Sequence, residues 1–284
     1  MGWALSYKVT EKLSVSQGPQ SPTSPPTFDD NGTNYVYVFA GFFALATAII
    51  LNCKQGKVAP QGSRHSAYIG MIGTGFIFAT FPFSGILWPS SAASNIYRRF
   101  ESPLNIYFAL TASVIVTYIS STIFGKLKIG VRESLIGVLS GGVTISVVSG
   151  VINNIGACIA IGAFSGVVSG FWLEVVHPRI NRNATLDHMG IFGPILICSV
   201  LGGLGLSPAL YQSFMDLSLN QNNLGNILVT DSQIMKYQLV YIGIAAGSGL
   251  VFGWIAGLLS ICFRNPADDF EFKKIINTDF GLYN

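Results

Sequence analysis

The chain has 284 residues, of which half are apolar and only 10% are Asp, Glu, Lys or Arg. A soluble globular domain is about 25% charged, so a chain with so few charges and a mean hydropathy of +0.52 cannot cover a water-facing surface. The net charge of +3 is too small to indicate a nucleic-acid partner. The four cysteines show no CxxC or CxH spacing, so the sequence predicts no metal site, disulfide framework or cofactor.

The chain begins with a polar segment, residues 1–34, that is rich in Ser, Pro, Thr, Gly and Asn from residue 13 onward. A segment of this composition cannot build a packed core. We therefore predict a tail that a neighbouring protein would have to hold in place. A second tail is predicted at residues 264–284, and residues 35–263 form the predicted transmembrane domain.

Apolar runs follow one another along this domain, and each is long enough to cross a hydrocarbon layer of about 30 Å. The runs are about twice as long as the ~10 residues of a barrel strand and show no period-two alternation, which favours helices. We predict an all-α membrane protein with about seven transmembrane helices, at residues 35–51, 67–88, 105–124, 133–152, 155–176, 190–211 and 237–263. Pro82 and Pro194 lie in the second and sixth of these helices, where kinks are tolerable if neighbouring groups satisfy the freed backbone.

The basic residues predict how these helices are oriented. Eleven of the sixteen Lys and Arg lie after the first, third and fifth helices and in the C-terminal tail. Basic residues concentrate on the cytoplasmic side of a membrane. The C-terminus is therefore predicted in the cytoplasm, or in the matrix for a mitochondrial inner membrane, and the N-terminus on the opposite side.

Two strips of glycine at four-residue spacing predict close helix packing. Glycine lets two backbones touch in lipid, where no hydrophobic effect drives helices together. The fifth predicted helix carries one strip and the seventh the other, comprising Gly162, Gly166, Gly170, Gly249, Gly253 and Gly257.

Several short runs, taken together in order and spacing, carry a family resemblance. They are Trp88-Pro89-Ser90, Asn105-Ile106-Tyr107, Leu139-Ser140-Gly141-Gly142-Val143, Ile161-Gly162-Ala163-Phe164-Ser165-Gly166, and Asp187-x-x-Gly190 followed by Leu201-Gly202-Gly203. From about residue 29 to the end the chain resembles the Rh glycoprotein and ammonium transporter superfamily, and the Rh branch more than the bacterial branch.

The resemblance implies a trimer of pores, each lying between two inverted five-helix repeats. The first predicted helix here matches the last helix of the first repeat. The next five match the second repeat, and the seventh matches the closing helix. Nothing in the sequence corresponds to the rest of the first repeat.

The resemblance also implies two facing histidines in the pore, which handle a proton near neutral pH. In this register their positions hold Tyr37 and Ile195, and the position of a gating phenylalanine holds Ser91. A phenol stays protonated at pH 7 and cannot take up that proton, and isoleucine has no donor or acceptor. We therefore expect a degenerate pore.

Two framework aspartates of the family match Asp29 and Asp187. They are interpreted as helix caps, with cation attraction as the alternative. His65 and His188 are interpreted as solvated. The group formed by Glu174, His177 and Arg179 is interpreted as a loop at the lipid headgroups.

Three classes of function compete. The first is a non-conducting structural subunit of a larger membrane complex, with other membrane subunits and lipids as partners. The second is a channel for ammonia, methylammonium or CO2, with a divergent pore or a separately encoded first half. The third is an unrelated seven-helix receptor or enzyme, although no catalytic constellation is visible and we predict that the chain is not an enzyme. The mitochondrial inner membrane is the favoured location, with the plasma membrane as the alternative.

Overall fold

The computed structural model describes residues 33–52, 64–83, 96–125, 130–149, 152, 154–181, 190, 192–205 and 231–262. The elements in these ranges are helical: α2 (Thr33–Asn52), α3 (Arg64–Thr80), α5 (Ile96–Phe124), α6 (Val131–Ser146), α7 (Ile155–Phe171), α8 (His177–Asn181), α9 (Phe192–Gly205) and α11 (Asp231–Cys262). A 3-10 turn, η1 (Phe81–Phe83), follows α3, and a π-helical turn, η2 (Trp172–Val176), joins α7 to α8. The described part of the chain is thus all-α, as predicted, with one helical element at each predicted span.

The described helices differ in how far they could reach across a membrane. Three segments are long and apolar enough by length and composition to span one: Glu101–Phe124, Ile155–Ile180 and Gln238–Cys262. Three further apolar helices are shorter, namely Tyr35–Leu51, Tyr68–Phe83 and Gly193–Leu204. A helix rises 1.5 Å per residue, so about 20 residues cross the hydrocarbon layer at full thickness. α6, with 16 residues, is mostly buried among its neighbours.

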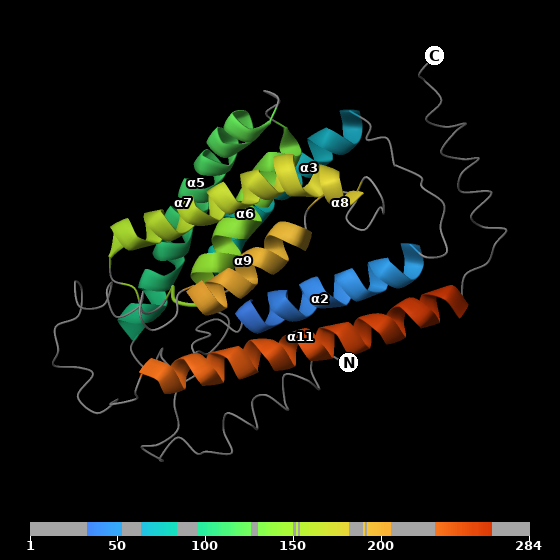
Figure 1. Cartoon of the computed structure of the whole chain (residues 1–284). Helices are drawn as coiled ribbons and strands as arrows, with labels where there is room; N and C mark the ends of the chain where they lie inside the picture. Colours follow the sequence, from blue (N-terminus) through green and yellow to red (C-terminus); the bar gives the residue numbers. More distant parts are fainter. Residues whose placement is uncertain are drawn as a thin grey trace.

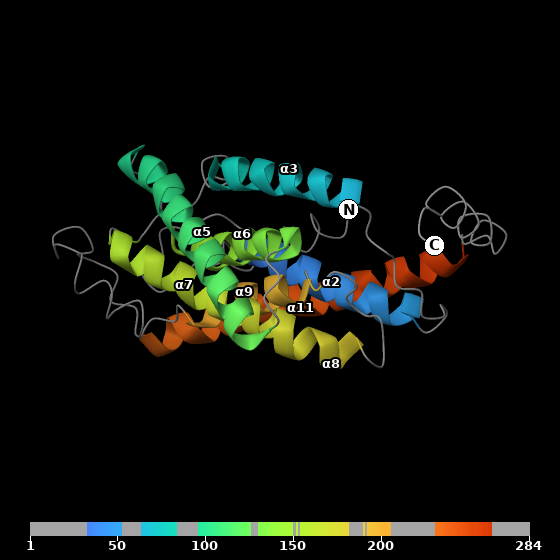
Figure 2. The same cartoon turned by 90° about the horizontal axis from the view of Figure 1, so that it is seen from above.

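The helices form two groups (Figure 1). α5, α6 and α7 pack against one another, and α2 lies alongside α11. α9 connects the groups because it packs against both α2 and α6. α3 lies at one side of the molecule, where it packs against α6 and η1 (Figure 2).

The glycine strip of α7 lies on the backbone of α5. A Cβ placed on Gly166 would lie 2.6 Å from the carbonyl oxygen of Ser113, Gly162 lies in the same way against Ala109, and Gly170 lies against the side chain of Ser120. Both series of numbers rise together, so α5 and α7 run parallel. A side chain larger than hydrogen at these positions would force the two helices apart.

The strip on α11 makes the same kind of contact with α2. Gly249 lies against the carbonyl oxygen of Phe39, Gly253 against that of Phe43, and Gly257 against the side chain of Ile50. These pairs also rise together, so α2 and α11 run parallel and end on the same side of the molecule.

The prolines of the predicted second and sixth spans lie near helix ends rather than in helix interiors. Pro194 is the third residue of α9, within the first turn, where a backbone N–H has no helical partner to lose. At Pro82 the outcome is a change of helix type, because α3 ends at Thr80 and continues as the 3-10 turn η1.

Two helix boundaries also differ from the prediction. α5 begins at Ile96, nine residues before the predicted Asn105, and it contains Pro103. The prediction followed apolar residues alone, whereas a helix can continue through charged residues outside the hydrocarbon layer. α6 ends at Ser146 rather than at residue 152, and in the segment that follows it the side-chain amide of Asn105 donates to the carbonyls of Ser149 (2.9 Å) and Ile152 (2.6 Å). Those carbonyls therefore need no helical donor.

Candidate pore region

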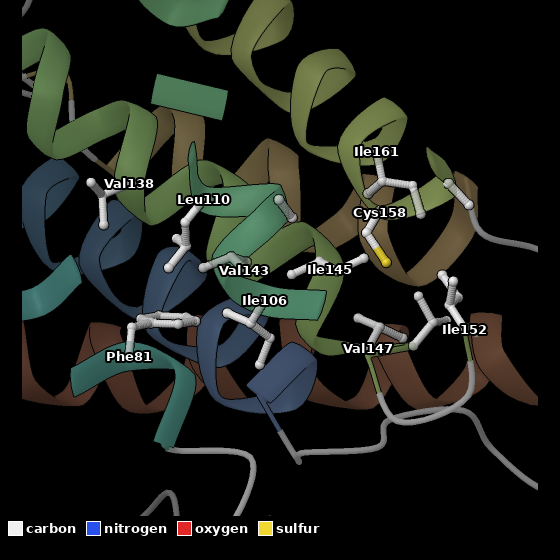
Figure 3. Close-up of a cluster of buried hydrophobic side chains, with 13 residues drawn as sticks. Phe81, Ile106, Leu110, Val138, Val143, Ile145, Val147, Ile152, Cys158 and Ile161 are labelled. Carbon is white, nitrogen blue, oxygen red and sulfur yellow. The ribbon is translucent and has the colours of Figure 1, made fainter. Parts of the chain in front are cut away.

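A cluster of buried apolar side chains fills the space between α5, α6, α7 and η1 (Figure 3). We call this set the core cluster, and its members are Phe81, Ile106, Ala109, Leu110, Val138, Val143, Ile145, Val147, Val148, Ile152, Ala157, Cys158 and Ile161. In Figure 3, Phe81 lies at one end of the core cluster and Ile152 and Cys158 lie at the other. Tyr37 and Ile195, which occupy two of the predicted pore positions, pack against the surface of this cluster.

Tyr37 lies on this surface, next to Phe81. The two rings stack with their centroids 6.1 Å apart and their planes 19° from parallel. Phe81 is only 8% exposed, and its ring lies against Gly142, where a Cβ would come within 2.5 Å of the ring. We call Tyr37 of α2 and Phe81 of η1 the aromatic pair. Because Gly142 of α6 has no side chain, the Phe81 ring can lie against α6 while it stacks on Tyr37.

Ile195, the second predicted pore position, packs against the same core cluster from α9. Its neighbour Leu196 fills the notch at Gly41 of α2, where a Cβ would lie 3.0 Å from the Leu196 Cβ. α2 and α9 therefore bring Tyr37 and Ile195 onto one apolar surface. The side chains there are aromatic and aliphatic, and among Tyr37, Phe81 and Ile195 the polar group is the Tyr37 hydroxyl.

The histidine whose side chain the structure describes, His177, lies elsewhere. It belongs to α8, where Arg132 of α6 donates from Nη2 to its ring, 3.0 Å from Nδ1. Glu174 lies in η2, close against Gly125 at the end of α5. The predicted headgroup loop of Glu174, His177 and Arg179 is thus a continuation of α7 by η2 and α8.

Hydroxyl groups line the contact of α5 with α6 and α7. Ser113 of α5 bonds to Ser140 of α6 at 3.1 Å and accepts from Ser165 of α7 at 3.2 Å. One turn later, Ser169 donates to the Ser165 carbonyl and lies 3.8 Å from the Cys198 sulfur of α9. Buried polar groups in lipid must find partners inside the protein, and these hydroxyls find them across helix contacts.

Several predicted site residues lie outside the described residues: Ser91, Asp29, Asp187 and His188, and the side chain of His65. Among the residues that the structure does describe, there is no group of three or more His, Cys, Asp or Glu that could hold a metal ion.

Sequence reasoning missed two residues of this region. Phe81 was not singled out, although a Phe-Pro pair inside an apolar run signals a break that can turn a side chain inward. Tyr107 was noted only as part of a family motif, yet its hydroxyl donates to the carbonyl oxygen of Ala79 at 2.8 Å and so ties α5 to the end of α3.

Comparison with known proteins identifies the family. Residues 2–265 match the Ammonium Transporter Family. The chain belongs to this family. It is 27% identical over 240 residues to Rhesus-like glycoprotein B of Dictyostelium discoideum, covering 80% of this chain and 39% of that protein. It is 28% identical over 194 residues to the ammonium transporter Rh type C of Rattus norvegicus, covering 65% of this chain and 38% of that protein.

The fold of this family member also matches solved structures. The structure described as Nitrosomonas europaea Rh50 superposes with a TM-score of 0.69 at 20% identity, covering 98% of this chain and 72% of that one. A sensor Amt protein superposes with a TM-score of 0.55 at 16% identity. The chain spans about two-fifths of the length of the two curated relatives named above. The all-α membrane fold is therefore established.

Proposed function

We propose that this family member does not conduct ammonium or ammonia and serves as a structural subunit of a larger membrane complex. The observation that carries the proposal is the stacking of Tyr37 on Phe81, on an apolar surface that Ile195 shares. The family resemblance implies that relatives which conduct ammonia carry facing histidines at the positions that match 37 and 195 here. Here those positions hold a phenol and an aliphatic side chain, neither of which relays a proton near pH 7.

The packing of the aromatic pair supports a closed region. Phe81 is almost completely buried and lies directly against Gly142. Moving a polar molecule past such a surface without compensating hydrogen bonds costs several kcal/mol. Phe81 belongs to the core cluster, and Tyr37 is a partly buried side chain that packs against it.

The second half of the proposal concerns partners. α3 presents large apolar side chains outward, with Ile69, Ile72 and Phe76 each about 70% exposed. Gly73 and Gly75, on the same helix, have nothing within 4 Å of a Cβ placed on them. A helix with little packing and bare glycines suits a contact with another membrane helix. We propose that other membrane subunits, together with lipids, cover this face in the native complex.

Flux into vesicles tests the first half. Purified full-length chain is reconstituted, and entry of ammonia and of methylammonium is measured against empty vesicles and against vesicles holding the rat Rh type C protein. The proposal expects rates equal to those of empty vesicles. Rapid saturable entry through this chain alone would refute it.

Purification in mild detergent tests the second half. We expect the native chain to migrate in a large heteromeric assembly, and we propose the mitochondrial inner membrane as its location, with the plasma membrane as the alternative. Fractionation of the membranes distinguishes the two. A stable homotrimer or monomer without other polypeptides would contradict the structural-subunit proposal.

A channel is the second candidate, and membership of the Ammonium Transporter Family favours it. In that case substrate would pass beside the aromatic pair, or a second chain would supply the missing part of a pore. Replacing Tyr37 with Ala would then change the flux of the assembled protein, whereas the structural-subunit proposal expects no flux with either residue.

A further inference from the structure

The break between α3 and η1 leaves a backbone carbonyl in need of a donor. Pro82 has no N–H. In an α-helix the residue at 82 would donate to the carbonyl of Phe78, and in a 3-10 turn it would donate to that of Ala79. The missing N–H of Pro82 therefore removes one possible donor to the carbonyls of Phe78 and Ala79 where the chain changes from α3 to η1. Within lipid, no water replaces it.

Tyr107 supplies a donor at this place. Its hydroxyl donates to the Ala79 carbonyl oxygen at 2.8 Å, and its ring packs against Phe78 with centroids 5.9 Å apart. On either side of Tyr107 in α5, Ile106 and Leu110 are fully buried in the core cluster. The buried side chains of Ile106 and Leu110 thus hold the α5 backbone on both sides of Tyr107, and the Tyr107 side chain extends to the C-terminal end of α3.

We propose that Tyr107 is a positioning residue that replaces the missing N–H of Pro82 and thereby fixes Phe81 against Gly142 and Tyr37. Its functional meaning rests on the proposed closed pore region, because Phe81 is half of the aromatic pair. A residue on α5 thus controls whether the aromatic pair stays stacked.

The weak packing of α3 makes this one bond important. α3 packs mainly against α6 and its own 3-10 extension, and most of its large side chains are exposed. At its beginning, Gly70 lies near Val131, where a Cβ would be 3.3 Å from the valine Cγ1. At its end, the contacts include the ring of Phe78 against Tyr107, the side chain of Phe81 in the core cluster, and the hydrogen bond from Tyr107.

Hydrogen exchange of residues 76–83 in the full chain, followed by mass spectrometry in lipid nanodiscs, tests the proposal. Tyr107→Phe keeps the ring and removes only the donor, and should make this segment exchange about three- to tenfold faster. Tyr118→Phe is the matched control, because it removes a hydroxyl on the same helix that bonds to Ser134 instead. It should leave the exchange of residues 76–83 unchanged.

Pro82→Ala provides the decisive comparison. Alanine restores an N–H at position 82, so the broken end no longer depends on Tyr107. In the Pro82→Ala background, Tyr107→Phe should change the exchange by less than about twofold. A purely general loss of stability would persist in that background, so an effect of the same size in both backgrounds would overturn the proposal. Unchanged exchange in Tyr107→Phe would overturn it as well.

Flux measurements on the same proteins keep the two proposals apart. Ammonia flux through the wild-type chain would refute the non-conducting function, whatever the exchange of residues 76–83. Absence of flux combined with unchanged exchange in Tyr107→Phe would refute the positioning role alone.

Discussion

Gly249 of α11 lies against Phe39 of α2 so closely that a Cβ at position 249 would be 2.6 Å from the Phe39 carbonyl oxygen. One turn later, a Cβ on Gly253 would lie 2.5 Å from the carbonyl oxygen of Phe43. Two backbones can approach this closely only where one of them carries no side chain. The association of α2 with α11 therefore depends on these glycines.

Replacing Gly249 with Leu should separate α11 from α2. Overpacking of this kind costs about 1–3 kcal/mol when the neighbours can move, and here the neighbour is backbone, so the cost should reach the upper end of that range. The measurement is the free energy of unfolding in mild detergent. Gly247→Leu is the control, because a Cβ at Gly247 meets nothing within 4 Å, and an equal loss in both variants would contradict the prediction.

Replacing Asn105 with Leu should destabilise the segment that follows α6. The Asn105 amide donates to two carbonyls there, those of Ser149 and Ile152. Leaving a buried acceptor without its donor costs about 1–3 kcal/mol. Thr111→Val is the comparison, since Thr111 is exposed and donates only within its own helix. Unfolding midpoints of the two variants should differ clearly, and equal midpoints would show that the Asn105 bonds contribute nothing.

Replacing Tyr37 with Ala should cost about 2–4 kcal/mol of stability, because it removes a ring that stacks on Phe81 and leaves a cavity beside the core cluster. Tyr37→Phe keeps the ring and should stay close to the wild type. Thermal unfolding of the three proteins checks this order. A loss in Tyr37→Phe as large as in Tyr37→Ala would mean that the hydroxyl, not the stacking, matters.

Thiol labelling in sealed vesicles should report the orientation of the helices. Cys262 is exposed at the end of α11, and the distribution of basic residues predicts that this end lies on the cytoplasmic or matrix side. Asn154 caps the start of α7 and is predicted on the opposite side. A membrane-impermeant reagent added outside right-side-out vesicles should label Asn154→Cys and leave Cys262 unreacted. The reverse pattern would invert the predicted topology.

Much of the fold could be predicted from residue type and run length alone. The scarcity of charge and the length of the apolar runs predicted helices in lipid, and each predicted run holds a helical element in the described structure. The boundaries could not be predicted in the same way. Pro103 lies inside α5, and α6 ends at Ser146, beyond which the Asn105 side chain, distant in the sequence, binds the carbonyls of Ser149 and Ile152.

The candidate pore region was predicted only in part. Family spacing pointed to Tyr37 and Ile195, and the structure places both on one apolar surface. Family spacing did not point to Phe81, because the position of that ring depends on how Pro82 ends α3 and on the space that Gly142 leaves on α6.

The sequence by itself determined that the chain forms helices in a membrane, since charge content and the length of apolar runs can be read along the chain without knowledge of tertiary contacts. Only the tertiary structure decided which helices and which residues are in contact. Which glycine strip faces α5 and which faces α2 depends on helix rotation, and the bond from Tyr107 to Ala79 joins residues 28 positions apart. Such contacts follow from the simultaneous packing of several helices, which local sequence patterns do not encode.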